Sequence, residues 1–214
     1  MLRKEESSVR LILNAVKNPM TWAVAVVCTV GYALYSLQGY FTPYLTAVVG
    51  VSAEESGIFA IIRTYVFFTL APIGGILADK VFKSTAKWIG TAFAIMAVVV
   101  AGFFFIPSGA NPMLIGFYTL LPSAFVQMTY TIKYSVMNEI HISPALLATT
   151  TSVVAFVGCV VDIAFTPFIG WCLDTKGDAA YTILFIMLIV LLILGAIAAF
   201  VIANRNKKSS KKAA

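Results

Sequence analysis

Two opposite charges lie inside stretches of the chain that are otherwise almost wholly apolar. Arg63 falls in the apolar run 56–78, and Asp162 falls in the apolar run 144–170. A charge buried in a membrane-length apolar run costs at least ~2.5 kcal/mol on insertion scales, so it usually has a partner or a function. At the rise of a helix, each residue lies about 10–12 Å from the outer end of its run. We therefore expect the two side chains at similar depths.

Three roles are open for Arg63. Its planar guanidinium could hold the carboxylate or phosphate of a substrate through two parallel hydrogen bonds. It could instead form an internal ion pair with Asp162 that breaks during a conformational cycle, or it could extend its charge to the membrane surface. Asp162 has a further possible role, because a carboxyl group in an apolar setting can bind and release a coupling proton.

Other side chains could complete a polar site. Lys133 lies near the inner end of the apolar run 113–137, where it could contact an anionic substrate or extend to the membrane surface. Gln127, Thr131, Tyr134 and Asn138 recur at intervals that predict one face of a helix. We expect a substrate site formed by Arg63, Tyr32, Tyr35, Gln38, Gln127, Tyr130 and Lys133. Tyr32 could alternatively belong to an aromatic belt at the membrane surface.

Other kinds of chemistry find little support in the sequence. Cys28, Cys159 and Cys172 lack the spacing of a zinc site or a disulfide framework, and no phosphate-binding loop of a primary pump is present. His141 is the single histidine, which is either a solvated residue at a helix end or a pH sensor. We expect no enzyme activity, no cofactor and no metal.

The segment 72–87 reads as a tight loop between two membrane helices. Gly74 and Gly75 are expected to let two backbones approach closely, as small residues do in lipid. Asp79, Lys80 and Lys83 then keep the end of this hairpin in water. A short loop rich in lysine belongs on the cytoplasmic side of the membrane.

Part of this loop recurs later in the chain. Pro72, Gly75 and Asp79 are matched, each 95 residues later, by Pro167, Gly170 and Asp174. A constant offset predicts duplication of a three-helix unit, and an odd number of crossings inverts the second copy, as in many transporters. Chance recurrence of Pro and Gly at helix ends is the alternative.

Composition places these elements in a membrane. The chain is 60% hydrophobic and 11% charged, with a mean hydropathy of +0.94, whereas soluble domains carry about 25% charged residues. Twelve of the 15 Lys and Arg residues fall in segments predicted to be cytoplasmic, and only Lys176 falls in a predicted external loop. We interpret the net charge of +6 as a sign of topology and not of nucleic-acid binding.

The sequence predicts an all-α polytopic membrane protein in the plasma (inner) membrane with both termini cytoplasmic. A basic segment, 1–19, contains a short surface helix, and a basic tail, 204–214, ends the chain. Between them, 20–203 forms a bundle with the first helix ending at Pro43. The predicted crossings are Met20–Tyr40, Ser56–Ala78, Trp88–Ile106, Met113–Met137, Pro144–Gly170 and Ala180–Ala203.

The loop resembles the signature of the major facilitator superfamily, Gly-x-Leu-Ala-Asp-Arg-x-Gly-Arg-Lys. The matching residues are Gly75, Leu77, Ala78, Asp79, Lys80 and Lys83, whereas Phe82 and Ser84 depart from the pattern. A second ending after the fifth predicted helix contains Gly170, Asp174 and Gly177. The chain thus resembles the carboxyl-terminal six-helix half of such a transporter. The resemblance implies two inverted three-helix repeats, a gating role for Gly75, Asp79, Lys80 and Lys83, and a partner. That partner is a missing amino-terminal half or a second copy of the chain.

The leading functional hypothesis is a secondary transporter, proton- or ion-coupled, that moves a small organic anion by alternating access. The alternative is a non-transporting fragment or membrane assembly partner that needs a separate amino-terminal half. Both hypotheses predict membrane lipid as the surroundings, and neither involves nucleic acid.

Overall fold

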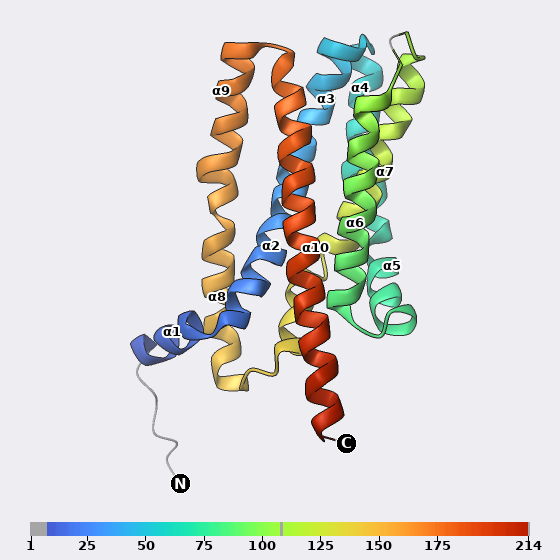
Figure 1. The fold of residues 1–214 in the computed structure, drawn as a ribbon. Coiled ribbons are helices and arrows are strands. Elements are labelled where there is room, and N and C mark those ends of the chain that lie inside the picture. Colours follow the sequence, from blue (N-terminus) through green and yellow to red (C-terminus); the bar gives the residue numbers. More distant parts are fainter. Residues whose placement is uncertain (1–7, 108, 214) are drawn as a thin grey trace.

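The computed structural model describes residues 8–107 and 109–213, and these residues form helices and connecting turns without any strand. Long helices run roughly parallel, and α1 lies across one end of the bundle (Figure 1). The chain ascends through α2 and α3, descends through α4 and α5, ascends in α6 and descends in α7. It then ascends through α8 and α9 and descends in α10.

The helices are α1 Ser8–Lys17, α2 Pro19–Leu37, α3 Phe41–Tyr44, α4 Ala53–Ile61, α5 Ala71–Ile76, α6 Thr85–Gly102, α7 Pro112–Tyr130, α8 Pro144–Gly158, α9 Thr166–Lys176 and α10 Ala179–Ala213. Short irregular turns join several of them end to end. Four are π-helical, namely Leu45–Val49, Ile62–Val66, Leu77–Val81 and Val161–Phe165. Four are 3-10 helical, namely Gln38–Tyr40, Phe67–Leu70, Phe103–Phe105 and Lys133–Ile140.

Within residues 8–107 and 109–213, five helical stretches are long and apolar enough to cross a membrane: Pro19–Val49, Ala53–Val81, Thr85–Phe105, Leu146–Lys176 and Ala179–Lys208. The chain is therefore an integral membrane protein. Helix α7 has a comparable length but is less apolar, because it carries Ser123 and Gln127 together with an internal proline, Pro122. These three residues are buried within the bundle, so the polar groups of α7 face other helices.

Local sequence sets several helix ends. Asn18 accepts a hydrogen bond from the backbone N–H of Met20 at the start of α2, where Pro19 needs no donor partner. Ser52 and Glu55 form a reciprocal capping box at the start of α4. The short helix expected within 1–19 is present as α1 from Ser8 onward, and residues 1–7 lie outside the described part of the chain.

Two predicted helix ends are wrong. The first crossing continues past Pro43, which falls in the first turn of α3 after a 3-10 turn and so removes no needed hydrogen bond. This crossing ends instead at Gly50, whose φ of 81° is left-handed. The fifth crossing continues past Gly170 to Lys176, because the next residue with a positive φ is Gly177.

A third predicted helix end is also wrong. The fourth crossing does not continue as one α-helix to Met137, because α7 ends at Tyr130 and a 3-10 helix begins at Lys133. Helix α10 remains helical to Ala213, so the described part of the predicted tail 204–214 continues that helix.

Packing is uneven across the bundle. Helix α6 packs closely on α10, where a Cβ at Gly195 would lie 2.7 Å from the ring of Phe93. The first crossing lies centrally, in contact with α7, α8 and α10. By contrast, only 11% of the apolar window in Ala53–Val81 and 22% of that in Leu146–Lys176 is buried inside the bundle. Among the five stretches, these two crossings are the least buried.

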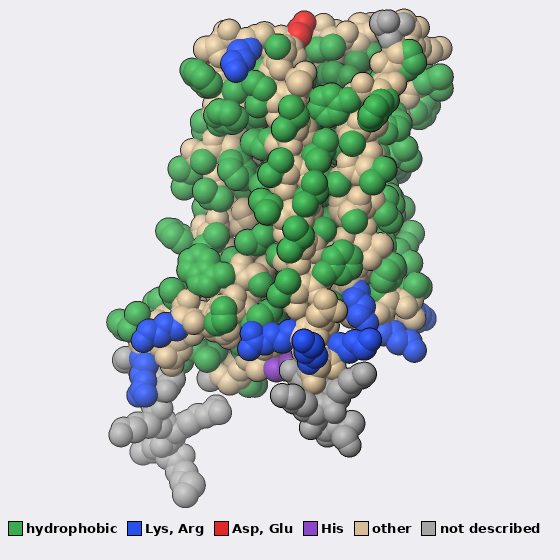
Figure 2. All heavy atoms as spheres, in the orientation of Figure 1, with side chains coloured by type: hydrophobic (Ala, Val, Ile, Leu, Met, Phe, Trp, Pro, Cys, Tyr) green, Lys and Arg blue, Asp and Glu red, His purple; other side chains and the backbone are tan. Residues whose placement is uncertain are grey.

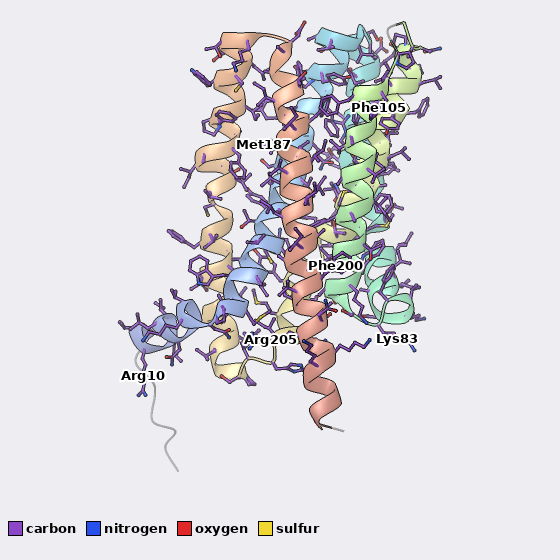
Figure 3. The ribbon with its side chains drawn as sticks, viewed as in Figure 1. Arg10, Lys83, Phe105, Met187, Phe200 and Arg205 are labelled. Atoms are coloured by element: carbon purple, nitrogen blue, oxygen red, sulfur yellow. The ribbon has the colours of Figure 1, made fainter. Side chains whose placement is uncertain are left out.

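Charge is concentrated at one end of the bundle, hereafter the basic end. Figure 2 shows a belt of Lys and Arg side chains at this end below a broad apolar surface. Figure 3 places Arg10, Lys83 and Arg205 there and Phe105 near the opposite end. Helix α1 and the last turns of α10 both lie at the basic end (Figure 1).

Candidate functional site

Arg63 lies in the core of the bundle on the π-helical turn Ile62–Val66. Its side chain is 2% exposed. Nη1 donates hydrogen bonds to the carbonyl of Gln38 (3.0 Å) and the hydroxyl of Thr42 (3.3 Å), and Nη2 donates to the hydroxyl of Thr119 (3.5 Å). The guanidinium therefore connects the end of the first crossing with α7.

A polar stripe on α7 completes this arginine cluster, which we define as Arg63, Gln38, Thr42, Thr119 and Gln127. Gln127 Nε2 donates to the backbone carbonyl of Arg63 at 3.3 Å. Thr119, Ser123 and Gln127 follow one another at intervals of four residues, and all three are buried. Thr42 and Thr119 were not predicted, although this spacing on α7 could have indicated Thr119.

The surroundings of Arg63 contradict its predicted extension to the membrane surface. They also do not show its predicted ion pair with Asp162. The guanidinium points into the core and does not extend to the membrane surface. Among the described residues, Arg63 and Asp162 do not form the predicted ion pair in this conformation, since each has other partners. The Nε atom of Arg63 is buried without a hydrogen-bond partner.

Lys133 lies at the interruption after α7 and is 6% exposed. Its Nζ is 3.4 Å from the ring centre of Tyr130, and Tyr32 and Tyr134 approach the same atom at 5.4 Å and 5.2 Å. Such contacts between an ammonium group and aromatic faces are attractive. Lys133 is thus held by tyrosines, contrary to the possibility that it extends to the membrane surface.

Asp162 lies on a second π-helical turn, Val161–Phe165, between α8 and α9. Its carboxylate accepts a hydrogen bond from the hydroxyl of Tyr32 at 2.6 Å, and the side chain is otherwise exposed. Tyr35 stacks on Tyr130 with ring centres 4.2 Å apart. Tyrosines from α2 and α7 therefore link the surroundings of Lys133 to Asp162.

These residues surround a cleft of about 220 Å³ between α2, the end of α7 and α8. We call it the lysine cleft and define it by Tyr32, Tyr130, Lys133, Tyr134 and Asp162. It combines one cationic group, one carboxylate and phenol hydroxyls, so it can bind a charged solute and also orient it by hydrogen bonds. Single π-turns of this kind are frequent at functional sites.

The structure separates the predicted substrate site into two groups. Tyr32, Tyr130 and Lys133 line the lysine cleft, and Tyr35 supports it by stacking on Tyr130. Arg63, Gln38 and Gln127 belong to the arginine cluster instead. The predicted stripe along the fourth crossing is interrupted after Gln127 and Thr131, because the helix changes type before Tyr134.

The signature loop lies at the basic end, with Asp79 and Lys80 on the π-helical turn Leu77–Val81. Lys83 adopts a left-handed φ of 51°, and Ser84 then caps α6. Glu139 accepts hydrogen bonds from the Ser84 hydroxyl (2.8 Å) and from the backbone N–H at position 86 (3.1 Å). The loop is therefore fixed to the segment that follows α7.

Two glycines before this loop differ in their surroundings. A Cβ on Gly74 would lie 1.9 Å from the carbonyl oxygen of Met128, so α5 and α7 approach closely at this residue. A Cβ on Gly75 would meet nothing within 4 Å. The predicted close approach is thus a property of Gly74 and not of Gly75.

The remaining candidates lie outside both groups. His141 Nε2 is 2.9 Å from the side-chain oxygen of Asn206, and its φ of 52° is left-handed. Cys28 and Cys172 are buried and Cys159 is exposed, all as free thiols. No group of three or more His, Cys, Asp or Glu side chains suited to a metal occurs in the described part of the chain.

Comparison with known proteins shows a similarity to a bacterial inner membrane protein. No family model matches the chain. The chain is 23% identical over 202 residues to the inner membrane protein YihN of Escherichia coli (strain K12). The similarity covers 93% of this chain and 48% of YihN, so the chain spans about half the length of this curated relative.

Proposed function

We propose that the chain is the carboxyl-terminal half of a secondary transporter of the major facilitator type, and that it carries a small organic anion. The observation that carries the proposal is the lysine cleft, in which Lys133, 6% exposed, and Asp162, within the crossing Leu146–Lys176, do not pair with each other. Ionisable groups buried in a bundle or carried by a membrane crossing typically mark a path for a solute or a proton.

The placement of the two sequence copies is consistent with this fold. Pro72 and Pro167, the matching prolines of the two sequence copies, each lie in the first turn of a new helix after an irregular turn. The helices that follow, α5 and α9, end at opposite ends of the bundle (Figure 1). Two inverted three-helix repeats, α2–α6 and α7–α10, would produce this arrangement. In it, α7 crosses the membrane in addition to the five apolar stretches and is the fourth of six crossings in chain order.

In the proposed mechanism, the anion binds beside the Lys133 ammonium. The hydroxyls of Tyr130 and Tyr134 orient it, because a phenol can donate one hydrogen bond to an anionic oxygen. Asp162 carries the coupling proton, and Tyr32 holds the carboxylate in place at 2.6 Å. The anion is exchanged between the two sides as this half rocks against a second half.

Arg63 has a different role under this proposal. Its guanidinium already donates to three acceptors on the first crossing and α7, so it positions the helices that form the lysine cleft. Contact between Arg63 and a substrate would require a second conformation in which Thr42 or Thr119 releases it.

Topology follows from the placement of charge. We propose that the basic end faces the cytoplasm across the inner membrane, because short loops rich in Lys and Arg stay on that side. The similarity to an inner membrane protein is consistent with this location. Both termini then lie in the cytoplasm, and Lys176 lies outside.

A second candidate is an assembly partner that transports nothing by itself. The broad exposed surfaces of Ala53–Val81 and Leu146–Lys176 favour it, since they leave large areas for another bundle. A separately encoded amino-terminal half is the preferred partner. Self-association through the same surfaces would require a two-fold interface.

Binding and transport are tested separately. The purified chain is heated with short dicarboxylates, sugar acids or alkyl sulfonates, and we expect one class to raise its unfolding temperature. Lys133→Gln should abolish that protection, whereas Lys176→Gln, a change in an exposed cation outside the cleft, should retain it. Protection that survives Lys133→Gln, or no protection by any anion, would contradict the proposal.

Transport is then measured as counterflow of the protective anion in liposomes. We expect saturable exchange when the chain is co-reconstituted with an amino-terminal six-helix half and none with the chain alone. Exchange by the chain alone would contradict the need for a partner, and no exchange with the partner would favour the assembly role.

A further inference from the structure

Helix α1 has the charge pattern of a helix that lies in a membrane surface. Arg10, Asn14 and Lys17 fall on one side of the helix at intervals of four and three residues. Ile12 and Val16 fall on the opposite side and are 48% and 37% exposed. A short helix with one basic face and one apolar face lies in the interface, with the apolar face toward the acyl chains.

An apolar groove lies beside this helix and is bordered by α1, the start of α2 and α8. Its volume is about 780 Å³, and its lining includes Leu11, Ile12, Val16, Trp22, Val153 and Phe156. Trp22 and Phe156 are 47% and 79% exposed. The indole N–H of Trp22 donates to the carbonyl of Val16 at 2.8 Å, so this ring is fixed against α1 as one wall of the groove.

The dimensions of the groove match one lipid chain. Its volume lies within the range of ligand sites, about 300–1,000 Å³. Along α8 it extends from Ala148 to Val157, which is about 14 Å at the rise of a helix. One leaflet of the hydrocarbon core is about 15 Å deep. The groove is therefore long enough to hold an acyl chain over most of the depth of one leaflet.

The positive charge beside the groove favours a lipid with an anionic headgroup. The basic face of α1 lies at the basic end of the bundle, where Figure 2 shows cations on several elements and Figure 3 places Arg10. A lipid with net negative charge is attracted to such a surface more strongly than a zwitterionic lipid of equal chain length.

From the groove, the interfacial helix and the basic rim, we infer that the chain binds an anionic glycerophospholipid at this site. One acyl chain lies in the groove between α1 and α8, and the phosphate lies at the basic end, where the charges of Arg10 and Lys17 attract it. The lipid would hold α1 onto α8 across space that protein side chains leave open. This inference is independent of the proposed transport function.

The first test measures retained lipid. The purified full chain is exchanged into equimolar phosphatidylglycerol and phosphatidylethanolamine with identical acyl chains, and bound lipid is counted by native mass spectrometry. We expect one preferentially retained phosphatidylglycerol. The double variant R10Q/K17Q should lower that preference by up to about fivefold for each charge removed. Val153→Trp, which fills the groove, should lose both lipids.

The matched control is K80Q/K83Q, which removes two cations of the basic end away from α1 and should leave the preference unchanged. Equal retention of the two lipids by the unaltered chain would overturn the inference. Equal losses in R10Q/K17Q and K80Q/K83Q would also overturn it, because a general charge effect would then suffice.

A second measurement does not depend on the groove-filling variant folding. In a Trp171→Phe background, quenching of Trp22 by brominated phosphatidylglycerol is compared with quenching by brominated phosphatidylethanolamine. Trp88, the remaining tryptophan, is 4% exposed and gives a constant background. We expect stronger quenching by the anionic lipid, and R10Q/K17Q should remove the difference. Equal quenching in the parent background contradicts the site.

Discussion

Replacing Gly74 with alanine should separate α5 from α7 at their point of closest approach. The new Cβ would lie 1.9 Å from the carbonyl oxygen of Met128, 2.7 Å from its carbonyl carbon and 2.9 Å from its Cα. These atoms belong to the backbone, so no side-chain rotation can relieve the contact. Overpacking costs about 1–3 kcal/mol, and we expect the upper end because one helix must move away from the other.

Gly75→Ala is the matched control, since nothing lies within 4 Å of its added methyl group. Alanine gains about 0.5–1 kcal/mol over glycine within a helix at either position. That gain cancels in the comparison, and the two variants should differ in unfolding free energy by about 3 kcal/mol, the upper limit of the overpacking cost.

Thermal unfolding can be followed with a thiol-reactive fluorophore in a Cys159→Ser background. The two remaining thiols, Cys28 and Cys172, are buried, so they react only as the bundle opens. Gly74→Ala should unfold at a clearly lower temperature than Gly75→Ala. Equal midpoints would show that α5 and α7 do not approach as closely as described.

Three further changes test the two polar groups and the loop. Arg63→Lys should destabilise the bundle by about 1–3 kcal/mol, because an ammonium cannot reproduce the fork of donors; wild-type stability would refute the connecting role. Tyr130→Leu should weaken anion protection of the chain by removing a contact worth up to about 2 kcal/mol to Lys133, and unchanged protection would refute that contact. Glu139→Ala should increase protease cleavage near Ser84, since it strands donors worth about 1–3 kcal/mol; unchanged cleavage would refute this restraint.

Local sequence signals predicted the extended features of the fold. Apolar length identified the crossings, and the lysine-rich segment after Gly75 identified a loop, because each signal depends on residues close together in the chain. The capping box of Ser52 and Glu55 was missed, although it is an equally local signal. The same signals misplaced helix ends at Pro43 and Gly170, where Pro and Gly occur within a continuing crossing. These crossings end instead at glycines with a positive φ, Gly50 and Gly177.

Which side chains meet could not be predicted in the same way. A π-helical turn adds a residue to the helix and rotates every later side chain by about 100°. Arg63 and Asp162 both lie on such turns, and no residue pattern announces them. The similar depths predicted for Arg63 and Asp162 therefore do not bring the two side chains into contact. Arg63 donates hydrogen bonds to Gln38 and Thr119, and Asp162 accepts one from Tyr32.

The carboxylate of Asp162 has few hydrogen-bond partners, so we expect it to face water or another protein surface. An ionised carboxylate has about four acceptor sites, and in the described residues only the Tyr32 hydroxyl occupies one. Ile163, the next residue, is 76% exposed, so exposure alone does not distinguish the two positions. A carboxylate facing lipid is costly, whereas isoleucine facing lipid is favourable. The two side chains should therefore face different surroundings.

Cysteine placed at each position distinguishes these surroundings in native membranes. In a Cys159→Ser background, Asp162→Cys should react with a charged, impermeant thiol reagent in membranes opened to both sides. Ile163→Cys should react far more slowly, because the reactive species is the thiolate, which lipid disfavours. The protective anion should slow labelling of Asp162→Cys, since that residue lines the lysine cleft. Labelling of Asp162→Cys as slow as that of Ile163→Cys would mean that Asp162 lies against lipid, and the lysine cleft could then not be a solute path.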